Sequence, residues 1–171
     1  MRLNNLQLIN FRNYDNLHLN FKRNINLLVG KNGQGKTNIV EAIYMLSFGK
    51  SFRTNKDKEI IKFGSENLYI GGNYLKNSSK GLIEVAIGNN KKGIKVNKIH
   101  IHKIQELLGN LNVVIFSPED LKLVKDGPRE RRSFIDKEIS QIIPKYYNYL
   151  VNYNKILIQR NNISLSCHIL R

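Results

Sequence analysis

The sequence predicts an α/β fold in which a buried strand leads into a phosphate-binding loop and then into a helix. Three observations support this. The apolar run INLLV at 25–29 precedes the glycine-rich segment GKNGQGKTN at 30–38, and the residues that follow repeat apolar side chains at helical spacing. A meander of short strands at 68–101 and a helical last third complete the predicted chain.

The elements before and around the loop follow from their patterns of apolar residues. Segments 3–11 and 17–21 alternate polar and apolar residues, which predicts a hairpin. The run 25–29 is continuously apolar, as in a strand buried on both faces. The helix after the loop has one apolar face, and we expect it to end at Gly49.

Downstream of the meander, 103–108 predicts one or two helical turns and 111–116 another buried strand. Ser117 and the proline after it are typical of a helix start. The later helical segment carries an apolar stripe that is usually core, formed by Tyr146, Leu150, Tyr153 and Leu157. We divide the chain into an ATP-binding lobe at 1–116 and the start of a helical lobe at 117–171.

The segment 30–37 matches the P-loop pattern of glycine, four residues, then Gly35, Lys36 and Thr37. Glycines let backbone N–H groups turn toward a phosphate that side chains would otherwise block. Lys36 is expected to reach the β and γ phosphates, and the Thr37 hydroxyl to coordinate Mg²⁺. The sequence therefore predicts an ATP and Mg²⁺ site made of Gly30, Lys31, Asn32, Gly33, Gln34, Gly35, Lys36 and Thr37.

Composition points to an anionic partner. The chain has 28 Lys plus Arg against 13 Asp plus Glu, a formal net charge of +15, which favours nucleic acid over an acidic membrane surface or solubility alone. No apolar run is long enough to span a bilayer, and the amino terminus lacks the apolar core of a signal peptide. A single cysteine, Cys167, cannot form an internal disulfide, which agrees with a reducing compartment. We therefore predict a cytoplasmic protein without a membrane partner.

Two segments resemble motifs that complete an ATPase site, but neither fits. LSFGK at 46–50 resembles a signature motif, yet it closes the predicted helix instead of opening a later one. VVIFSPED at 113–120 resembles a Walker B strand, but Ser117 stands where the acidic metal ligand belongs. Glu119 and Asp120 fit better as acids in a first helical turn. Because no catalytic base is identifiable, we expect nucleotide binding without efficient hydrolysis.

Three segments in order resemble the RecF family of bacterial DNA replication and repair proteins, which are SMC-like members of the ABC ATPase superfamily. They are LQLINFRNYDNLHLNF, NINLLVGKNGQGKTNIVEAIYMLSFGKSFRT and VVIFSPEDLKLVKDGPRERRSFID. A generic P-loop match would bring neither SFRT after its helix nor SPEDL and GPRERRSFID downstream. The resemblance runs from residue 2 to about residue 162 and corresponds to the amino-terminal half of a complete family member.

The resemblance implies a P-loop ATPase head of the ABC and SMC type, with a mixed sheet, an antiparallel meander and the start of a helical second lobe. It also implies an ATP-dependent homodimer that binds single-stranded or gapped duplex DNA. Such proteins act with RecO and RecR to load RecA in recombinational repair and the SOS response, as weak DNA-dependent ATPases when full-length. By the same resemblance, Arg12 is expected at the phosphates of its own nucleotide; the alternative is a surface arginine beside the hairpin.

Two basic clusters are candidate DNA contacts, namely Lys50, Arg53 and Lys56, and then Arg129, Arg131 and Arg132. The alternative for the three later arginines is an ion-pair set with Glu130, Asp136 and Glu138. Lysines of the meander could likewise contact DNA or merely protect turns and edges.

Other functions stay open at this point. A P-loop kinase of a small substrate could use RERR as a phosphate-clamping lid, and a transporter's nucleotide subunit would need a membrane partner. The tail NISLSCHILR departs from the expected continuation of the family, so we also expect a truncated form, a frameshifted form or an inactive fragment.

Overall fold

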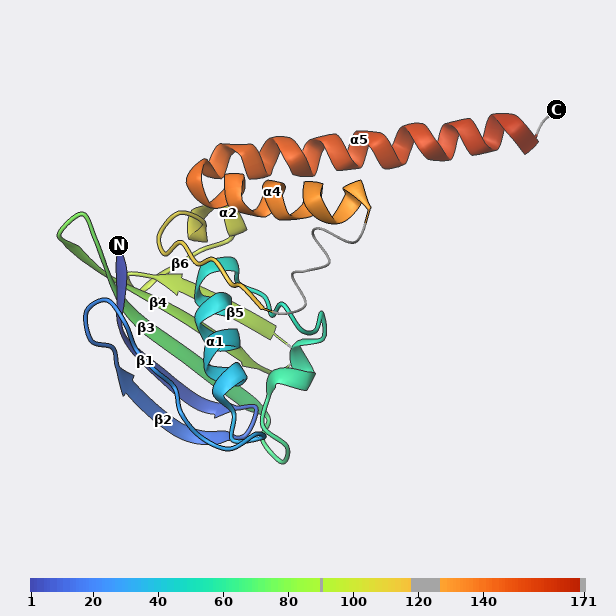
Figure 1. Cartoon of the computed structure of the whole chain (residues 1–171). Coiled ribbons are helices and arrows are strands. Elements are labelled where there is room, and N and C mark those ends of the chain that lie inside the picture. Colours follow the sequence, from blue (N-terminus) through green and yellow to red (C-terminus); the bar gives the residue numbers. More distant parts are fainter. Residues whose placement is uncertain (90, 118–126, 170–171) are drawn as a thin grey trace. The chain divides into compact units, whose positions relative to one another are not determined.

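The computed structural model describes residues 1–89, 91–117 and 127–169, and it divides into two compact units, Met1–Ile115 and Phe116–Arg171 (Figure 1). In chain order the first unit contains β1 (Arg2–Phe11), β2 (Tyr14–Asn20), α1 (Lys36–Phe48), the 3-10 helix η1 (Asp57–Ile60), β3 (Asn67–Lys76), β4 (Ser79–Gly88), β5 (Lys91–Val96), β6 (Ile99–His100) and α2 (Ile104–Leu107). The second contains α4 (Pro128–Ile142) and α5 (Pro144–Ile169). The assignment of 1–116 and 117–171 to an ATP-binding and a helical lobe stays a prediction.

The sheet has six strands in the order β2-β1-β3-β4-β5-β6. This arrangement confirms the predicted hairpin and the predicted meander. Every strand pair in the described residues is antiparallel, so the parallel pairing expected of a mixed sheet is not found there. The sheet is therefore built from neighbours in sequence, except that β1 pairs with β3 across the phosphate loop and α1.

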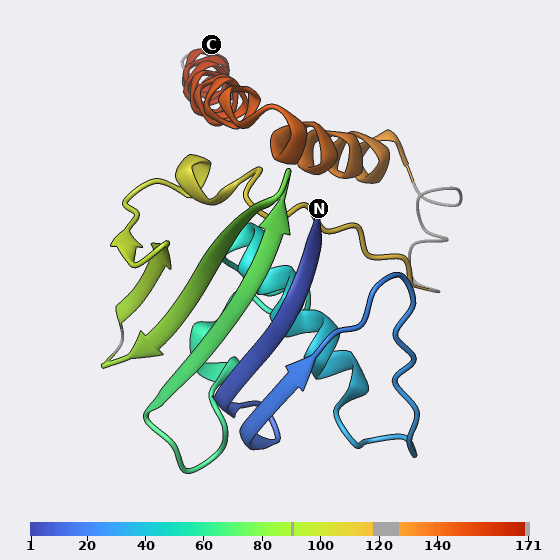
Figure 2. The ribbon, with the colours of Figure 1, turned by 90° about the vertical axis from the view of Figure 1, so that its left-hand side faces the viewer.

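The helix α1 covers one face of the sheet and closes the core of the first unit (Figure 2). Leu6 and Leu8, two residues apart in β1, lie on the same face of the sheet and are fully buried. Met45 and Leu46 of α1 are fully buried as well. Gly72 of β3 permits the close approach, since a β-carbon there would lie 2.4 Å from Leu46 Cδ1. Packing of this kind places the beginning of α1, and with it the phosphate loop, beside the turn between β1 and β2.

The prediction of buried strands at 25–29 and 111–116 was wrong, because neither segment is a strand in the structure. The side chains of Ile25, Leu27 and Val29 are 87%, 83% and 82% exposed, and Val114 is 67% exposed. An apolar strand is buried only when a neighbouring strand satisfies its backbone and covers its side chains. No described strand pairs with either segment. In the second segment, Leu111 is nevertheless buried in the core and Val113 packs against it.

The ends of α1 follow the sequence signals. The helix begins at Lys36, directly after Gly35, and ends where Gly49 adopts a left-handed backbone with φ 68°. The Gly49 N–H donates to the Met45 carbonyl at 2.8 Å, which satisfies an orphan carbonyl of the last turn. The predicted helix stop at Gly49 is thereby confirmed.

In the second unit, α4 and α5 pack against each other and are separated at Ile143, because Pro144 disfavours helical backbone in the residue before it. Tyr146 of α5 donates to the Asp136 carboxylate of α4 at 2.5 Å. The predicted stripe is not fully buried, since Tyr153 is 61% exposed. The predicted helix start after Ser117 continues into 118–126, which lie outside the described residues.

Candidate phosphate-binding site

The phosphate loop is exposed and depends on glycine for its shape. Gly33 and Gly35 have φ of 82° and 99°, values that L side chains rarely adopt. Residues 31–34 are exposed, so the loop is open to a ligand from solvent. This backbone explains why glycine is required at these two positions.

Lys36 closes the loop on itself. Its Nζ donates to the carbonyls of Gly30 and Lys31, each at 2.7 Å. Thr37 follows in the first turn of α1 with an exposed side chain. That turn contains no acidic residue, so the positive end of the helix dipole is not neutralised by its own sequence. Together these features suit an anion at the start of α1.

The turn between β1 and β2 lies directly against the loop. Asn13 Nδ2 and the Tyr14 hydroxyl both donate to the Gln34 carbonyl, at 3.2 and 3.3 Å. A β-carbon on Gly35 would come within 2.6 Å of Asn13 Oδ1 and 2.8 Å of the Tyr14 hydroxyl. Burial raises the pKa of Tyr14, which keeps its hydroxyl protonated as a donor. Sequence reasoning missed both residues, although they directly follow Arg12.

Arg12 makes a two-pronged contact with Glu41 of α1. Its Nε donates to Glu41 Oε2 at 3.0 Å and its Nη2 to Glu41 Oε1 at 2.6 Å, while its Nη1 donates to the Glu59 carbonyl at 2.6 Å. The Arg12 side chain is only 19% exposed, so it is not the surface arginine of the alternative prediction. Its contact with a nucleotide stays a prediction.

Glu41 itself was missed from the sequence. Its side chain is fully buried, and the signal that could have found it is a single acid within the apolar segment NIVEAIYML. Buried carboxylates are rare unless paired with a cation or with several donors. Such a residue in a sequence therefore indicates a partner elsewhere in the chain.

Arg53, predicted as a DNA contact, binds to side chains of α1, including Glu41. Its Nη1 donates to Asn38 Oδ1 at 2.8 Å and approaches Glu41 Oε2 at 3.3 Å. Asn38 Nδ2 in turn donates to Asn13 Oδ1 at 2.8 Å. A continuous set of side-chain contacts therefore joins Arg53 to the turn that holds the phosphate loop.

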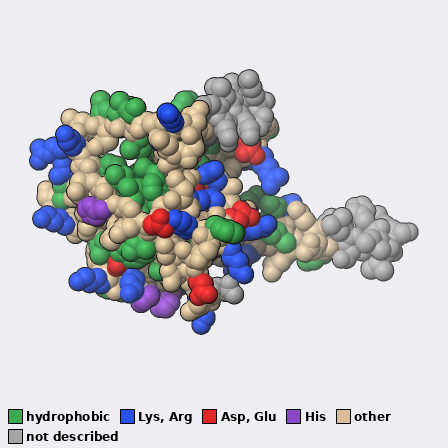
Figure 3. All heavy atoms as spheres, turned by 90° about the horizontal axis from the view of Figure 1, so that it is seen from below, with side chains coloured by type: hydrophobic (Ala, Val, Ile, Leu, Met, Phe, Trp, Pro, Cys, Tyr) green, Lys and Arg blue, Asp and Glu red, His purple; other side chains and the backbone are tan. Residues whose placement is uncertain are grey.

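The other predicted DNA contacts are more exposed. Lys50 is exposed, and Lys56 is 80% exposed with Glu59 at 3.4 Å. The three arginines of the later cluster lie in the first two turns of α4, in the other unit, and are exposed. Figure 3 shows Lys and Arg side chains in several separate groups on the face it presents. Contact of these residues with DNA stays a prediction.

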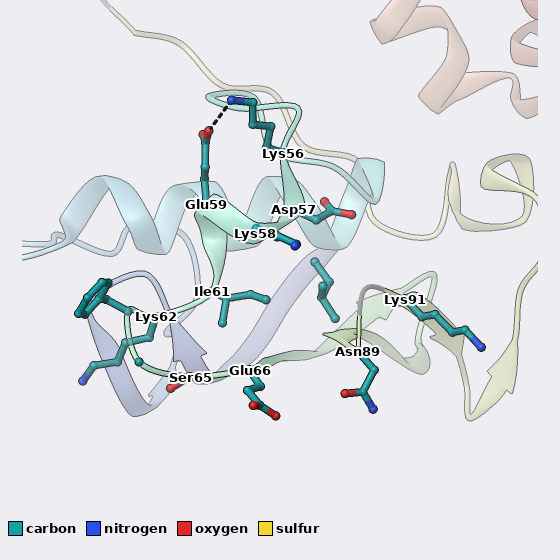
Figure 4. Close-up of a pocket in the computed structure, with 13 residues that line it drawn as sticks. Lys56, Asp57, Lys58, Glu59, Ile61, Lys62, Ser65, Glu66, Asn89 and Lys91 are labelled. Carbon is teal, nitrogen blue, oxygen red and sulfur yellow. Dashed lines mark ion pairs between the residues drawn. The ribbon is translucent and has the colours of Figure 1, made fainter.

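A separate hollow of about 1120 Å³ lies between the segment that follows η1 and the turn from β4 to β5. Its lining includes Lys58, Glu59, Lys62, Glu66 and Lys91, so charges of both signs meet there (Figure 4). None of residues 30–37 lines it. The hollow is therefore distinct from the phosphate loop, and its mixed charge does not favour a polyanion.

In the parts of the chain that the structure describes, none of the helices has the length and apolar composition of a membrane span. No three His, Cys, Asp or Glu side chains gather there as a metal site would require.

Comparisons with known proteins bear on this site. The family described as AAA domain matches residues 5–166. "DNA replication and repair protein RecF" of Clostridioides difficile (strain 630) is 70% identical over 169 residues, 99% of this chain and 46% of that protein. RecF of Alkaliphilus oremlandii (strain OhILAs) is 53% identical over 164 residues, 95% of this chain and 45% of that protein.

Solved structures give the same result. The recombination mediator protein RecF with ATPrS in the RecFOR pathway has a TM-score of 0.87 at 40% identity, over 94% of this chain and 44% of that one. An SMC head domain from Thermotoga maritima has a TM-score of 0.50 at 20% identity, over 63% of this chain and 41% of that one, and shows the fold alone. The predicted P-loop ATPase head is thereby confirmed.

The matches differ in how far they extend. The tail at 162–171 was expected to depart from the family: the similarity to the Clostridioides difficile protein covers 169 residues, whereas that to the Alkaliphilus oremlandii protein covers 164. The chain spans less than half the length of the relatives it matches. The resemblance to the amino-terminal half of RecF is confirmed.

Proposed function

Because this chain belongs to the AAA domain family and is similar to the amino-terminal half of RecF, we propose that it is the ATP-binding part of a DNA replication and repair protein. The observation that carries the proposal is the open glycine loop at the start of α1, with the Lys36 ammonium against its carbonyls. The similarity to RecF favours this function over a small-molecule kinase or a transporter subunit.

The residues present fit a nucleoside triphosphate with Mg²⁺. Backbone N–H groups of 30–35 would hold the phosphates, and the Lys36 ammonium, which contacts the Gly30 and Lys31 carbonyls in this structure, would supply a positive charge to them. Thr37 would supply a hydroxyl ligand to the ion, and the bound ion would neutralise phosphate charge. Arg12, expected at the phosphates from the resemblance to RecF, contacts Glu41 and the Glu59 carbonyl in this structure and would have to leave them to act as a further cation.

We also propose that the chain binds DNA through phosphate contacts that do not read sequence. The net charge of +15 and the exposed basic residues Lys50, Lys56, Arg129, Arg131 and Arg132 support this, with Arg53 added if it leaves Glu41. Action with RecO and RecR, RecA loading, the SOS response and an ATP-dependent homodimer belong to the proposal through the similarity to RecF. A cytoplasmic location belongs to the proposal for the same reason. ATP hydrolysis is expected to be weak.

The test is a calorimetric titration of MgATP into the 171-residue chain. We expect binding by the parent chain and none by Lys36→Ala, since the variant loses the point charge at the β and γ phosphates. Lys80→Ala, at an exposed lysine of β4, is the matched control and is expected to bind like the parent. Equal heats from the parent and Lys36→Ala would contradict the proposal, as would no binding by a folded parent.

A further inference from the structure

The geometry points to Glu41 as a positioning residue for the phosphate loop. We propose that Glu41 holds the turn between β1 and β2 against the loop and thereby sets the affinity of the loop for a nucleotide's phosphates. The inference rests on the proposed function for its ligand. The Glu41 side chain makes no hydrogen bond to residues 30–37, so it acts on the loop through the residues that it binds.

Glu41 is the point where three segments of the chain converge. Its Oε1 accepts from Arg12 at 2.6 Å and from the Ser51 hydroxyl at 2.5 Å, while its Oε2 accepts from Arg12 at 3.0 Å and from Arg53 at 3.3 Å. The carboxylate is fully buried, so its charge is tolerated only while these donors stay in place. Glu41 therefore fixes the positions of the β1–β2 turn and of the segment after α1.

Two routes lead from Glu41 to the loop, and both pass through Asn13. The first runs through Arg12, whose chain neighbours Asn13 and Tyr14 hold the Gln34 carbonyl. The second runs through Arg53 and Asn38 to the Asn13 side chain. Loss of the Glu41 charge would remove the contacts of both arginines with this carboxylate and loosen the turn, which the Glu59 and Ile60 carbonyls would still hold through Arg12.

The Gln34 carbonyl matters because it shares a peptide group with the Gly35 N–H. In a trans peptide these two groups point in opposite directions. Donors from the turn that fix the carbonyl therefore also fix the direction of the Gly35 N–H, away from the turn. Gly35 has φ 99° and is the last residue before α1, where an anion meets both the loop and the helix terminus.

The test compares Glu41→Gln, which keeps the side-chain volume and removes the charge, with the parent chain in MgATP titration. We expect about a tenfold weaker affinity, within the usual range of coupling between sites. Glu84→Gln is the matched control, because Glu84 is a half-buried carboxylate of β4 that accepts from the Tyr69 hydroxyl at 2.9 Å and lies outside both routes. It is expected to lower stability and leave the affinity unchanged.

A second variant covers the case in which Glu41→Gln does not fold. Asn13→Ala removes the second route and one of the two donors to the Gln34 carbonyl without disturbing the buried charge. The Tyr14 hydroxyl still donates to that carbonyl, so we expect a smaller loss of affinity than in Glu41→Gln. Combined with a folded Glu41→Gln it should add less than a second tenfold loss, because both changes act on the same carbonyl. Parent-like affinity in folded Asn13→Ala and Glu41→Gln would overturn the inference and leave the proposed function standing.

A measurement without nucleotide separates the two proposals. The amide resonance of Gly35 is expected to shift in Asn13→Ala and in Glu41→Gln, since its peptide group loses hydrogen bonds at the Gln34 carbonyl, and to stay in place in Glu84→Gln. If the parent fails to bind MgATP, the proposed function fails and this shift still decides the role of Glu41. Unshifted Gly35 resonances in both variants would overturn that role.

Discussion

The guanidinium of Arg12 and the carboxylate of Glu41 form a two-pronged ion pair, at 2.6 and 3.0 Å, between residues 29 apart in sequence. The pair joins the turn of the first hairpin to the helix that follows the phosphate loop. Because Glu41 is fully buried, the pair links the stability of the first unit to the geometry of the candidate site.

Removal of Arg12 is therefore expected to destabilise the fold. Arg12→Met keeps much of the apolar stem but leaves a buried carboxylate without its main cation, and such losses cost about 3 kcal/mol. The free energy of unfolding by urea measures the change. Lys62→Met is the matched control, because Lys62 pairs with Asp15, whose side chain is 80% exposed, and a surface pair contributes about 1 kcal/mol or less. Equal losses in the two variants would contradict the prediction.

Alanine at Gly33 and at Gly35 should separate backbone strain from crowding. Both positions have positive φ, and a side chain there costs about 1–2 kcal/mol. Nothing lies within 4 Å of a β-carbon on Gly33, whereas one on Gly35 meets Asn13 at 2.6 Å. Gly35→Ala is therefore expected to cost about 1 kcal/mol more, since Asn13 must leave the Gln34 carbonyl. Urea unfolding of the two variants measures the difference, and an equal or reversed order would count against this packing.

Stability at high pH should depend on Tyr69. Burial and then the hydrogen bond to Glu84 raise the pKa of Tyr69 to about 12 from 10.0. The folded chain keeps the phenol proton more tightly than the unfolded chain, so this contribution is complete below pH 10 and is lost as the pH rises toward 12. The free energy of unfolding should fall more steeply over this range in the parent than in Tyr69→Phe. Identical slopes would show that the Tyr69 proton plays no part.

DNA affinity should depend on salt and on the arginines of α4. Arg129→Ala and Arg132→Ala, each in the exposed first turns of α4, are expected to weaken binding and to reduce the salt slope by about one unit each. Fluorescence anisotropy with a gapped duplex at several salt concentrations measures both. Lys145→Ala, an exposed lysine near the start of α5, is the control and should change neither. Affinity that hardly varies with salt in the parent would exclude phosphate contacts as the basis of binding.

The sequence was sufficient for the elements that depend on local interactions. Glycine spacing predicted the phosphate loop, since positive φ at Gly33 and Gly35 is a property of single residues. Alternation predicted the hairpin and the meander, and Gly49 predicted the end of α1. In each case the physical cause lies in residues that are close together in the sequence.

The exposure of 25–29 shows where this reasoning fails. A continuous apolar run indicates that a segment requires burial on two faces, but it does not reveal whether a neighbouring strand is available. In the described residues none pairs with it, and Leu27 remains 83% exposed.

The sequence by itself determined the phosphate loop, the following helix, the antiparallel strands and the positive charge, because these depend on residue types and short spacings. Only the tertiary structure decided that Glu41 collects Arg12, Ser51 and Arg53, and that Asn13 holds Gln34 across 21 positions. A buried charge requires hydrogen-bond donors, and these can come from distant parts of the sequence. Packing of the hairpin on α1 decides which residues supply them, and no local sequence pattern contains that information.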